Sequence, residues 1–427
     1  MTARPGLAAL VLTLAAGAGA HGAQAGDGWS IAEAGPDIPP AVPVSLAPDG
    51  RALAAGSDCD ETACSTLLTT HAPGGPFLPA GRVPGRLQAS TPLRAGAALV
   101  VTSPLSSRGL TAFEVTSAGR PAGSAVLERR HATAAVAASD RHGTTAVAWL
   151  TSITPRQLRV RVRRRDGGTF SPARAVASFR RAEAFGGAAV AVGPRGEVAV
   201  LWASGGALHV RVLRPGARRF DPALRAGPSD RVARIAAAYT TGGTLAAIWS
   251  SADGGEEQNR AAVVRVSALR PGATRFSRHV RLGEGAGRET LLLAAGTAVR
   301  AVAAGRTANV AWTSRSLRVR LGTVHADGRV SAVRSLDARG VLADAVGSMT
   351  GRALIAWTHD PLGPDAGARA VLRATPERLG AIEPAGPTGS RATGAALDDR
   401  ATRALVSWSA GDPVLSSRWG IAERRAP

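Results

Sequence analysis

Short apolar segments, separated by turns that contain glycine or proline, run along most of the chain. In the clearest copy, Asp140 to Trp149, a glycine at position 143 is followed by a largely apolar run that ends in tryptophan. Six of the eight tryptophans end such a run, so we interpret them as one repeated packing position. These anchor tryptophans are Trp149, Trp202, Trp249, Trp312, Trp357 and Trp408, separated by 53, 47, 63, 45 and 51 residues. A period of this length predicts a propeller or a solenoid.

Two degenerate copies precede the first anchor tryptophan, with Gly56 and Thr102 in its place, which gives eight units in all. One unit shows the internal pattern well, because four short strands alternate with turns at 188–192, 197–202, 208–213 and 219–224. We name such strands a, b, c and d, from the axis of a propeller to its rim. The pattern predicts an all-β fold, a β-propeller of eight four-stranded blades, with seven blades as the alternative count.

Strands a and b are apolar on both faces, as expected of sheets packed between neighbouring blades. Strand c alternates instead: Leu158, Val160 and Val162 are interleaved with Arg159, Arg161 and Arg163. We expect one buried face there, with the arginine heads reaching water.

The last unit ends one strand short, after 415–422, and the missing strand lies at the other end of the chain. Residues 28–35, which include Trp29, are similar to the expected d strands that begin at Phe170 and Phe220. Pairing of this N-terminal strand with the C-terminal blade would close the ring and remove an open sheet edge. Trp29 would then lie near the rim.

The turn Ala47-Pro48-Asp49-Gly50 before an apolar strand resembles the repeats of TolB-type propellers. The phrase Gly167-Gly168-Thr169-Phe170-Ser171-Pro172 is similar to the fourth strand of secreted bacterial propellers of sialidase-like architecture. The resemblance covers nearly the whole chain as a fold pattern. It implies no activity, because propellers host unrelated functions.

The N-terminus has the features of a secretory signal peptide: Arg4, an apolar run at 7–16, and Ala23-Gln24-Ala25 as a cleavage site. We therefore expect residues 1–25 to be a signal peptide and 26–427 a single propeller domain, secreted and without a transmembrane segment. The chain has two cysteines, Cys59 and Cys64, which we expect to form a disulfide in an oxidising compartment.

The formal net charge is +21, and all 52 basic residues are arginine. Arginine and alanine of this abundance are typical of a GC-rich genome of the actinobacterial kind. Aromatic residues make up 4%, too few for base-stacking platforms, so we expect no specific nucleic-acid partner. Attraction to anionic cell-wall or membrane surfaces fits the charge better.

A sialidase-like or lyase-type carbohydrate-active enzyme is the alternative to a binding protein. The single tyrosine, Tyr239, lies in Ala236-Ala237-Ala238-Tyr239, which we interpret as an inner-strand packing position rather than a nucleophile. His359-Asp360 has the residue types of a general base and its orienting acid, but adjacent strand residues point to opposite faces. We therefore predict no catalytic residue, although a propeller site can gather residues from many blades.

Acidic residues gather in the expected b–c loops, where mutation bias toward arginine explains them least. We predict a binding face there, formed by Asp58, Asp60, Glu61, Asp253, Glu256, Glu257, Asp360 and Asp365. Asp58, Asp60 and Glu61 are also candidate Ca²⁺ ligands, but their spacing fits no defined calcium loop, so we expect no metal and no cofactor. The sequence favours an exported, monomeric, non-enzymatic propeller that binds a ligand, a protein or a carbohydrate of the cell envelope.

Overall fold

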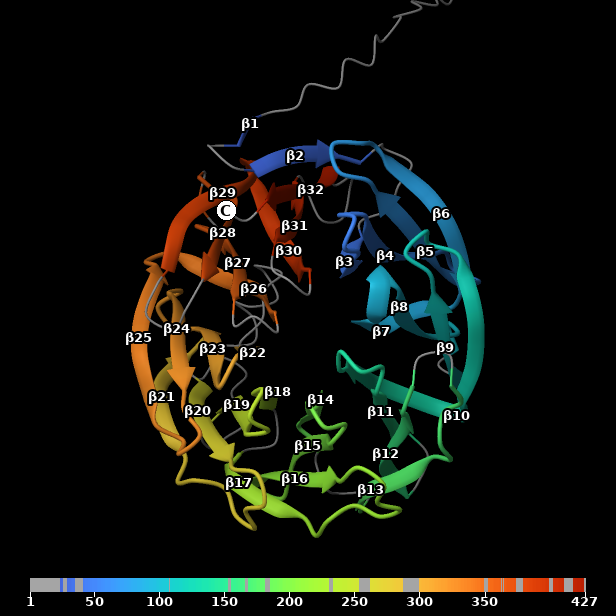
Figure 1. The fold of residues 1–427 in the computed structure, drawn as a ribbon, viewed down its shortest axis with the longest axis vertical. Helices are drawn as coiled ribbons and strands as arrows, with labels where there is room; N and C mark the ends of the chain where they lie inside the picture. Colours follow the sequence, from blue (N-terminus) through green and yellow to red (C-terminus); the bar gives the residue numbers. More distant parts are fainter. Residues whose placement is uncertain are drawn as a thin grey trace, which may run out of the picture.

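The computed structural model describes most of the chain after residue 40, together with two short N-terminal segments. The described residues are 24–25, 29–34, 41–106, 108–152, 155–165, 168–180, 185–229, 233–252, 262–286, 299–348, 352–361, 363, 365–373, 379–398, 402–410 and 418–425. They form an all-β ring around a central axis (Figure 1). In this part of the chain, no helix is long and apolar enough to cross a bilayer.

Antiparallel strands form the sheets, which we number as blades 1 to 8 in chain order. Blade 1 has β3 (Val42–Leu46), β4 (Ala52–Cys59), β5 (Cys64–His71) and β6 (Phe77–Pro84). Blade 2 has β7 (Arg86–Pro92), β8 (Ala98–Ser103), β9 (Arg108–Val115) and the first part of β10 (Pro121–Ser139). Blade 3 has the rest of β10, β11 (Thr145–Thr151), β12 (Arg156–Arg163) and β13 (Arg174–Phe179). Blade 4 has β14 (Gly187–Val192), β15 (Val198–Ser204), β16 (Ala207–Leu213) and β17 (Leu224–Pro228).

The second half of the ring repeats this arrangement. Blade 5 has β18 (Ala233–Tyr239), β19 (Leu245–Ala252), β20 (Ala262–Leu269) and β21 (Val280–Gly285). Blade 6 has β22 (Val299–Ala304), β23 (Thr307–Thr313), β24 (Val319–Val324) and β25 (Val330–Asp337). Blade 7 has β26 (Gly340–Gly347), β27 (Ala353–His359), β28 (Gly367–Arg373) and β29 (Leu379–Thr388). Blade 8 has β30 (Ser390–Leu397), β31 (Arg403–Ala410), β32 (Arg418–Arg425) and β2 (Trp29–Glu33), with β1 (Gln24–Ala25) paired to β2.

The buried apolar residues lie between the blades. They fall into clusters that each lie mainly between two neighbouring blades, from blades 1 and 2 round to blades 8 and 1. Each innermost strand contacts the innermost strand of the next blade, and β30 contacts β3. Apolar strands a and b therefore have a neighbour on both faces, which is why they carry no alternating polar face. The fold is the β-propeller that the periodicity predicts.

The anchor tryptophans occupy one equivalent place in this packing. Each lies near the end of strand b and packs into the cluster shared with the preceding blade, as Trp202 does between blades 3 and 4. Trp149, Trp249, Trp312 and Trp357 are fully buried, and Trp202 and Trp408 nearly so. Burial of each large ring contributes several kcal/mol, about 3 to 5 kcal/mol by the effect of removing one. The repeated tryptophan is thus an inter-blade contact.

Glycine recurs before strand b because the a–b turn needs a left-handed residue there. Gly143 has a φ of 86° and donates its N–H to the carbonyl of Asp140, and Gly196 has a φ of 83° in the matching turn of blade 4. A residue with a Cβ is strained at such angles. The repeat pattern therefore records turn geometry as well as packing.

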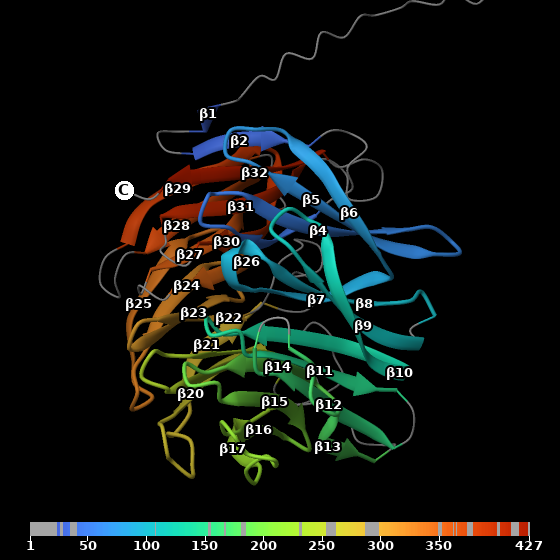
Figure 2. The ribbon, with the colours of Figure 1, turned by 45° about the vertical axis from the view of Figure 1, so that its right-hand side comes forward.

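The N-terminal strand pairs with the C-terminal blade, since residues 29–33 of β2 run antiparallel to β32. Figures 1 and 2 show β2 beside β32, on the outer edge of blade 8. Trp29 lies near the rim, as the sequence predicts, because β2 is outside β32 in the sheet. It is nevertheless 3% exposed, and its Nε1 donates to Glu383 Oε2 at 2.6 Å. The neighbouring strand β29 of blade 7 covers it.

The d strands begin later than the sequence pattern predicts. In blade 4 the strand starts at Leu224, where the predicted strand ended, and in blade 3 it starts at Arg174. Phe220 and Phe170 lie before these strands and pack against the blade edges. Proline follows soon after each phenylalanine and offers no N–H to a ladder, so regular pairing begins only beyond it.

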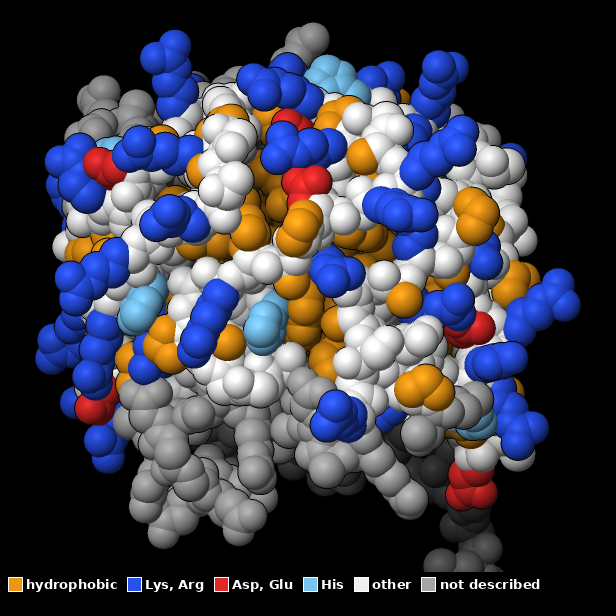
Figure 3. Space-filling model, turned by 90° about the horizontal axis from the view of Figure 1, so that it is seen from below, with side chains coloured by type: hydrophobic (Ala, Val, Ile, Leu, Met, Phe, Trp, Pro, Cys, Tyr) orange, Lys and Arg blue, Asp and Glu red, His pale blue; other side chains and the backbone are white. Residues whose placement is uncertain are grey.

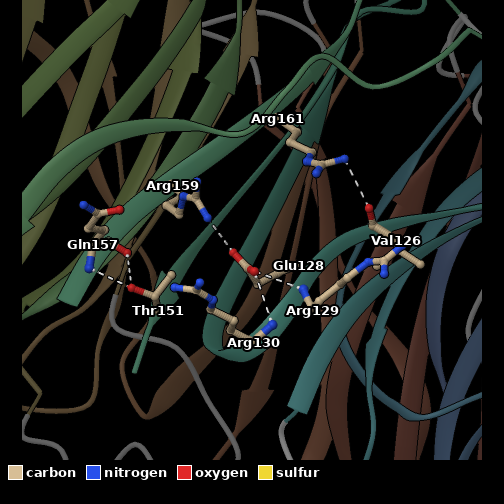
Figure 4. A network of polar contacts seen from close by, with 8 residues as sticks. All are labelled: Val126, Glu128, Arg129, Arg130, Thr151, Gln157, Arg159 and Arg161. Carbon is tan, nitrogen blue, oxygen red and sulfur yellow. Dashed lines mark hydrogen bonds and ion pairs between the residues drawn. The ribbon is translucent and has the colours of Figure 1, made fainter. Parts of the chain in front are cut away.

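The junction of blades 2 and 3 is a continuous strand rather than a loop. β10 pairs with β9 up to His131 and with β11 from Ala132 onward, with register shifts on the way. At the crossing, Glu128 Oε1 accepts the N–H groups of Arg129 and Arg130, and its Oε2 lies 2.8 Å from Arg159 Nη1 (Figure 4). Its side chain is 8% exposed. A buried carboxylate with three donors fixes the bend.

The arginines of strand c are less exposed than expected. Arg163 is 3% exposed and lies 2.5 Å from Glu114 Oε2, and Arg159 bonds to Glu128. Our expectation that these heads reach water is therefore wrong for Arg163 and only partly right for Arg159. Glu114 of β9 and Glu128 of β10 neutralise them from the preceding blade, which makes a buried guanidinium tolerable.

Candidate functional site

The two ends of the propeller carry different connections. Because neighbouring strands are antiparallel, the a–b turns and c–d loops lie at one end, which we call the a–b end. The b–c loops and d–a joints lie at the other, the b–c end. Side chains that are far apart in the sequence can meet only if their loops share an end, so each candidate residue is assigned to one of them.

A cavity of about 290 Å³ lies on the axis at the a–b end. Its walls are the last residues of inner strands and the turns that follow, and most are small and apolar, among them Ala138, Ala191, Ala238, Ala303 and Gly347. They come from blades 3, 4, 5, 6 and 7. Inner strands rich in alanine and valine leave this space open at the centre of the ring, because large side chains there would meet across the axis.

The carboxylates that line the axial cavity are engaged in their own turns. Asp140 Oδ1 accepts the N–H groups of His142 and Thr144, each at 2.8 Å, while its Oδ2 is buried without a hydrogen-bond partner. The carboxylate of Asp398 accepts the N–H groups of Thr402 and Arg403 and the Thr402 hydroxyl. Both acids shape a–b turns, which leaves little of either group to act on a substrate.

Two arginines at the mouth of the cavity are exposed. Arg94 lies in the η1 turn (Arg94–Gly96) of blade 2 and donates its Nε to the carbonyl of Arg141 at 2.7 Å. Arg141 in turn donates its Nε to His142 Nε2 at 3.0 Å. Both side chains line the cavity and belong to exposed residues.

A smaller cavity of about 100 Å³ lies at the same end, between blades 4 and 5. Arg195, Arg214 and Arg270 line it, together with Glu197, Asp221 and Tyr239. Tyr239 also lines the axial cavity, so the two hollows are neighbours. Seen from the side of blades 3 to 5, arginine is far more frequent on the surface than acidic side chains (Figure 3).

Tyr239 is placed for packing, as the sequence indicated. It is 8% exposed and lies in the apolar cluster between blades 4 and 5. Burial raises the pKa of its phenol, and the nearby negative charge of Glu197 raises that pKa further. Its place in the apolar cluster is that of a packing residue.

The predicted acidic face is only partly within the described residues, because Asp253, Glu256 and Glu257 lie outside them. Asp58, Asp60 and Glu61 lie at the tip of the β4–β5 hairpin, which Cys59 and Cys64 close with the predicted disulfide. Asp60 Oδ1 accepts three hydrogen bonds, from Thr62 N, Thr62 Oγ1 and Ala63 N, and Asp58 pairs with Arg82 at 2.9 Å. These hydrogen bonds lower the pKa of Asp60.

The other two described members, Asp360 and Asp365, follow β27 in blade 7. The structure thus places the described acids in two groups, on blades 1 and 7, and none of them lines the two a–b cavities. Within the described residues, no three His, Cys, Asp or Glu side chains are grouped to hold a metal ion. A partner for these loops stays a prediction.

His359 pairs with Asp337 and not with its sequence neighbour Asp360. His359 Nδ1 lies 2.8 Å from Oδ2 of Asp337, at the end of β25 in the preceding blade, and the same oxygen accepts Trp357 Nε1 at 2.6 Å. Burial would raise the pKa of Asp337, but hydrogen bonds from Arg339 N, Trp357 and His359 outweigh it and hold the pKa below its ordinary value. The sequence could have indicated this pair only through position, because Asp337 ends a d strand and Trp357 is the anchor tryptophan of the next blade.

A wider hollow of about 530 Å³ lies at the b–c end between blades 5 and 6. Arg320 and the edge of Trp312 line it, and Arg315 Nη1 lies 3.3 Å from Glu284 Oε2 beside it. Segments 253–261 and 287–298, which adjoin these blades, lie outside the described residues.

Comparison with known proteins supports the fold and goes no further. No family model matches the chain, and no curated protein matches its sequence. A prolyl endopeptidase structure is 12% identical with a TM-score of 0.50, and the match covers 87% of this chain and 55% of that one. A streptogramin B lyase is 8% identical with a TM-score of 0.46, covering 94% and 99%, and the Hadza microbial sialidase Hz136 is 13% identical with a TM-score of 0.39, covering 73% of each. At these identities the likeness is one of fold, and the chain is similar to these proteins as a β-propeller.

Proposed function

We propose that the protein is an exported, non-enzymatic propeller that binds a ligand or a protein at the cell envelope, with the axial cavity as its principal site. The observation that carries this is the composition of the cavity. Alanine and valine are its commonest lining residues, and the two acids that line it are hydrogen-bonded in turns. Its polar donors are the arginines at the mouth and the hydroxyl groups of Ser139, Thr240, Thr241 and Ser348. A mostly apolar hollow with few polar groups is a binding site in form.

Two features support export. The N-terminus has the charge, apolar run and small residues of a signal peptide, and the Cys59–Cys64 disulfide fits an oxidising compartment. Expression of the full chain in a secreting bacterium tests this point, because processed protein should begin at Gly26. Full-length protein retained in the cytoplasm would contradict it.

A cavity-filling variant tests the binding role. Ala238→Phe places a ring in the axial cavity, whereas Ala118→Phe adds the same ring to an exposed c–d turn of the same end. We expect Ala238→Phe, but not Ala118→Phe, to lose capture of a component from a detergent-solubilised envelope fraction, with both proteins still folded by circular dichroism. Equal capture by wild type and both variants would remove the axial cavity as the site.

The alternative, a carbohydrate-active enzyme, is favoured by one observation, the Asp337–His359 pair. A histidine whose Nδ1 is held by a carboxylate has the arrangement of an oriented general base. Wild type and His359→Ala should be compared on fluorogenic sialosides and other glycosides. We expect no turnover by either protein, and turnover that depends on His359 would replace the binding proposal with the enzymatic one.

A further inference from the structure

The two cavities of the a–b end are neighbours, and we call them together the track. Tyr239 lines both the axial cavity and the smaller hollow between blades 4 and 5, so the track leads from the axis toward the rim. Arginines lie along its length: Arg94 and Arg141 at the axial mouth, and Arg195, Arg214 and Arg270 beyond Tyr239. All five side chains belong to exposed residues.

The acids beside the track are committed to other contacts. Asp140 and Asp398 accept backbone N–H groups of their turns, and Glu197 Oε2 accepts the N–H of Arg195 at 3.0 Å. Asp221 Oδ2 lies 2.9 Å from Arg214 Nε. Apart from the buried Oδ2 of Asp140, the carboxylate oxygens named here serve the turns and one ion pair. Arg270 donates its Nε to the carbonyl of Ala326 at 3.1 Å, which holds its side chain at the edge of the smaller hollow. The excess of guanidinium over carboxylate groups makes the track positively charged.

We propose that this track binds a linear polymer that carries an anionic group on every repeat. The inference rests on the proposed function, because it requires a propeller that binds rather than cleaves. Guanidinium groups bind phosphate and carboxylate oxygens through paired N–H donors, and arginines spaced along a track suit charges spaced along a chain. Among the described residues that line the two cavities, Tyr239 is the single aromatic one and it is buried, so this part of the wall offers nucleic-acid bases no stacking surface.

Matched charge variants separate this site from the overall positive charge. The track variant is Arg94→Gln, Arg141→Gln, Arg195→Gln and Arg270→Gln together. The control variant is Arg86→Gln, Arg108→Gln, Arg234→Gln and Arg339→Gln, four exposed arginines of the b–c end. Each variant removes the same charge, so a difference between them reports position.

Binding of long-chain inorganic polyphosphate, polyglutamate and single-stranded DNA should be measured by calorimetry over a salt series. We expect the track variant to bind polyphosphate or polyglutamate at least about tenfold more weakly than wild type, with a shallower salt dependence, while the control stays close to wild type. Binding of polyphosphate alone identifies repeating phosphates, and binding of polyglutamate alone identifies repeating carboxylates. Binding of both identifies repeated charge as the recognised feature.

Three results would overturn the inference. Equal losses in the two variants would mean that only net charge matters, and preferential binding of single-stranded DNA would point to a nucleic-acid partner. Absence of polyanion binding by wild type, with envelope capture still sensitive to Ala238→Phe, would reject the polymer and leave the proposed function standing. Failure of the capture experiment itself would instead reject the proposed function.

Discussion

Blades 2 and 3 are joined by one continuous strand, whereas blade 8 is completed by strands from opposite ends of the chain. At the first junction, β10 serves both blades, and Glu128 holds its bend through Arg159 and two backbone N–H groups. At the second, β2 pairs with β32, and Glu383 of blade 7 accepts both Trp29 Nε1 and Arg424 Nη1 at 2.6 Å.

The two junctions differ in whether a strand can detach from its blade when its side-chain contacts are lost. β10 cannot leave its neighbours without bending a covalent strand, but β2 can detach with only a loss of hydrogen bonds and of the Trp29 contacts. Each junction uses a carboxylate to fix the edge of a blade: Glu128 is buried, and Glu383 is largely buried. Connectivity, rather than the type of contact, should therefore decide which junction opens first.

Removal of residues 27–38 should have the largest effect, because it deletes β2 and leaves the outer edge of β32 unpaired. We expect a large fall in the melting temperature, or aggregation, by scanning calorimetry and size-exclusion chromatography. Protein that lacks only residues 1–25 is the control, and its melting temperature should equal that of the full-length protein. If the 27–38 deletion melts like this control, β2 does not hold the ring closed.

Tryptophan replacements at the two junctions should come next. Trp149→Ala lies between blades 2 and 3 and Trp29→Ala at the closure, and each should lower the free energy of unfolding by about 3 to 5 kcal/mol. Trp29 also loses its bond to Glu383, so it belongs in the same range although it lies in an outer strand. Chemical denaturation measures both, with Trp→Phe at each site as the milder control. A loss below about 1 kcal/mol at Trp29 would show that the closure does not depend on this contact.

The β-propeller architecture could be predicted from the sequence because every blade has the same local steric requirements. A left-handed turn, an apolar strand sandwiched on both faces and a tryptophan at its end are local demands, so glycine and tryptophan mark them in each unit. The late start of β17 and β13 was missed because Phe220 and Phe170 look like strand residues, while the proline after each delays the ladder.

Side-chain partners between blades were not readable, since they depend on which residues the ring brings together. Asp337 and His359 are 22 residues apart and on different blades. Tyr239 lines two cavities, and this depends on how the turns of blades 4 and 5 are arranged in the folded ring. The sequence does contain an indication of the continuous β10. No glycine or proline occurs from Ser124 to His142, where a joint and a turn were expected to interrupt the chain.

Glu128→Gln should give a smaller loss, of about 2 to 3 kcal/mol at neutral pH, because Arg159 keeps partial access to water. Burial would raise the pKa of Glu128, but hydrogen bonds from Arg130, Arg129 and Arg159 outweigh it, so the folded pKa lies below the unfolded one. Its contribution is then complete above the ordinary glutamate pKa of about 4.3 and declines as the pH falls through the folded value. The gap between wild type and Glu128→Gln, measured by urea unfolding, should narrow in acid.

Glu383→Gln is the matched change at the closing junction, and at neutral pH it should be at least as destabilising if detachable strands depend more on their side-chain contacts. A gap for Glu128→Gln that is unchanged down to pH 3 would contradict an ionised Glu128 as the source of the effect.

Replacement of both cysteines by serine should have the smallest effect, because this covalent link lies at neither junction. Cys59 and Cys64 face each other across the β4–β5 hairpin at the b–c end, and the ladder from Asp58 and Ser65 inward remains without them. In the chain-entropy model so short a loop contributes about 2 kcal/mol at most, much less than covalent continuity can contribute where blades meet. We expect the melting temperature of the Cys59→Ser, Cys64→Ser variant to fall by a few degrees, with a single transition of unchanged sharpness. A fall as large as that of the 27–38 deletion would mean that the hairpin of blade 1, and not the β2–β32 contact, is where the ring opens.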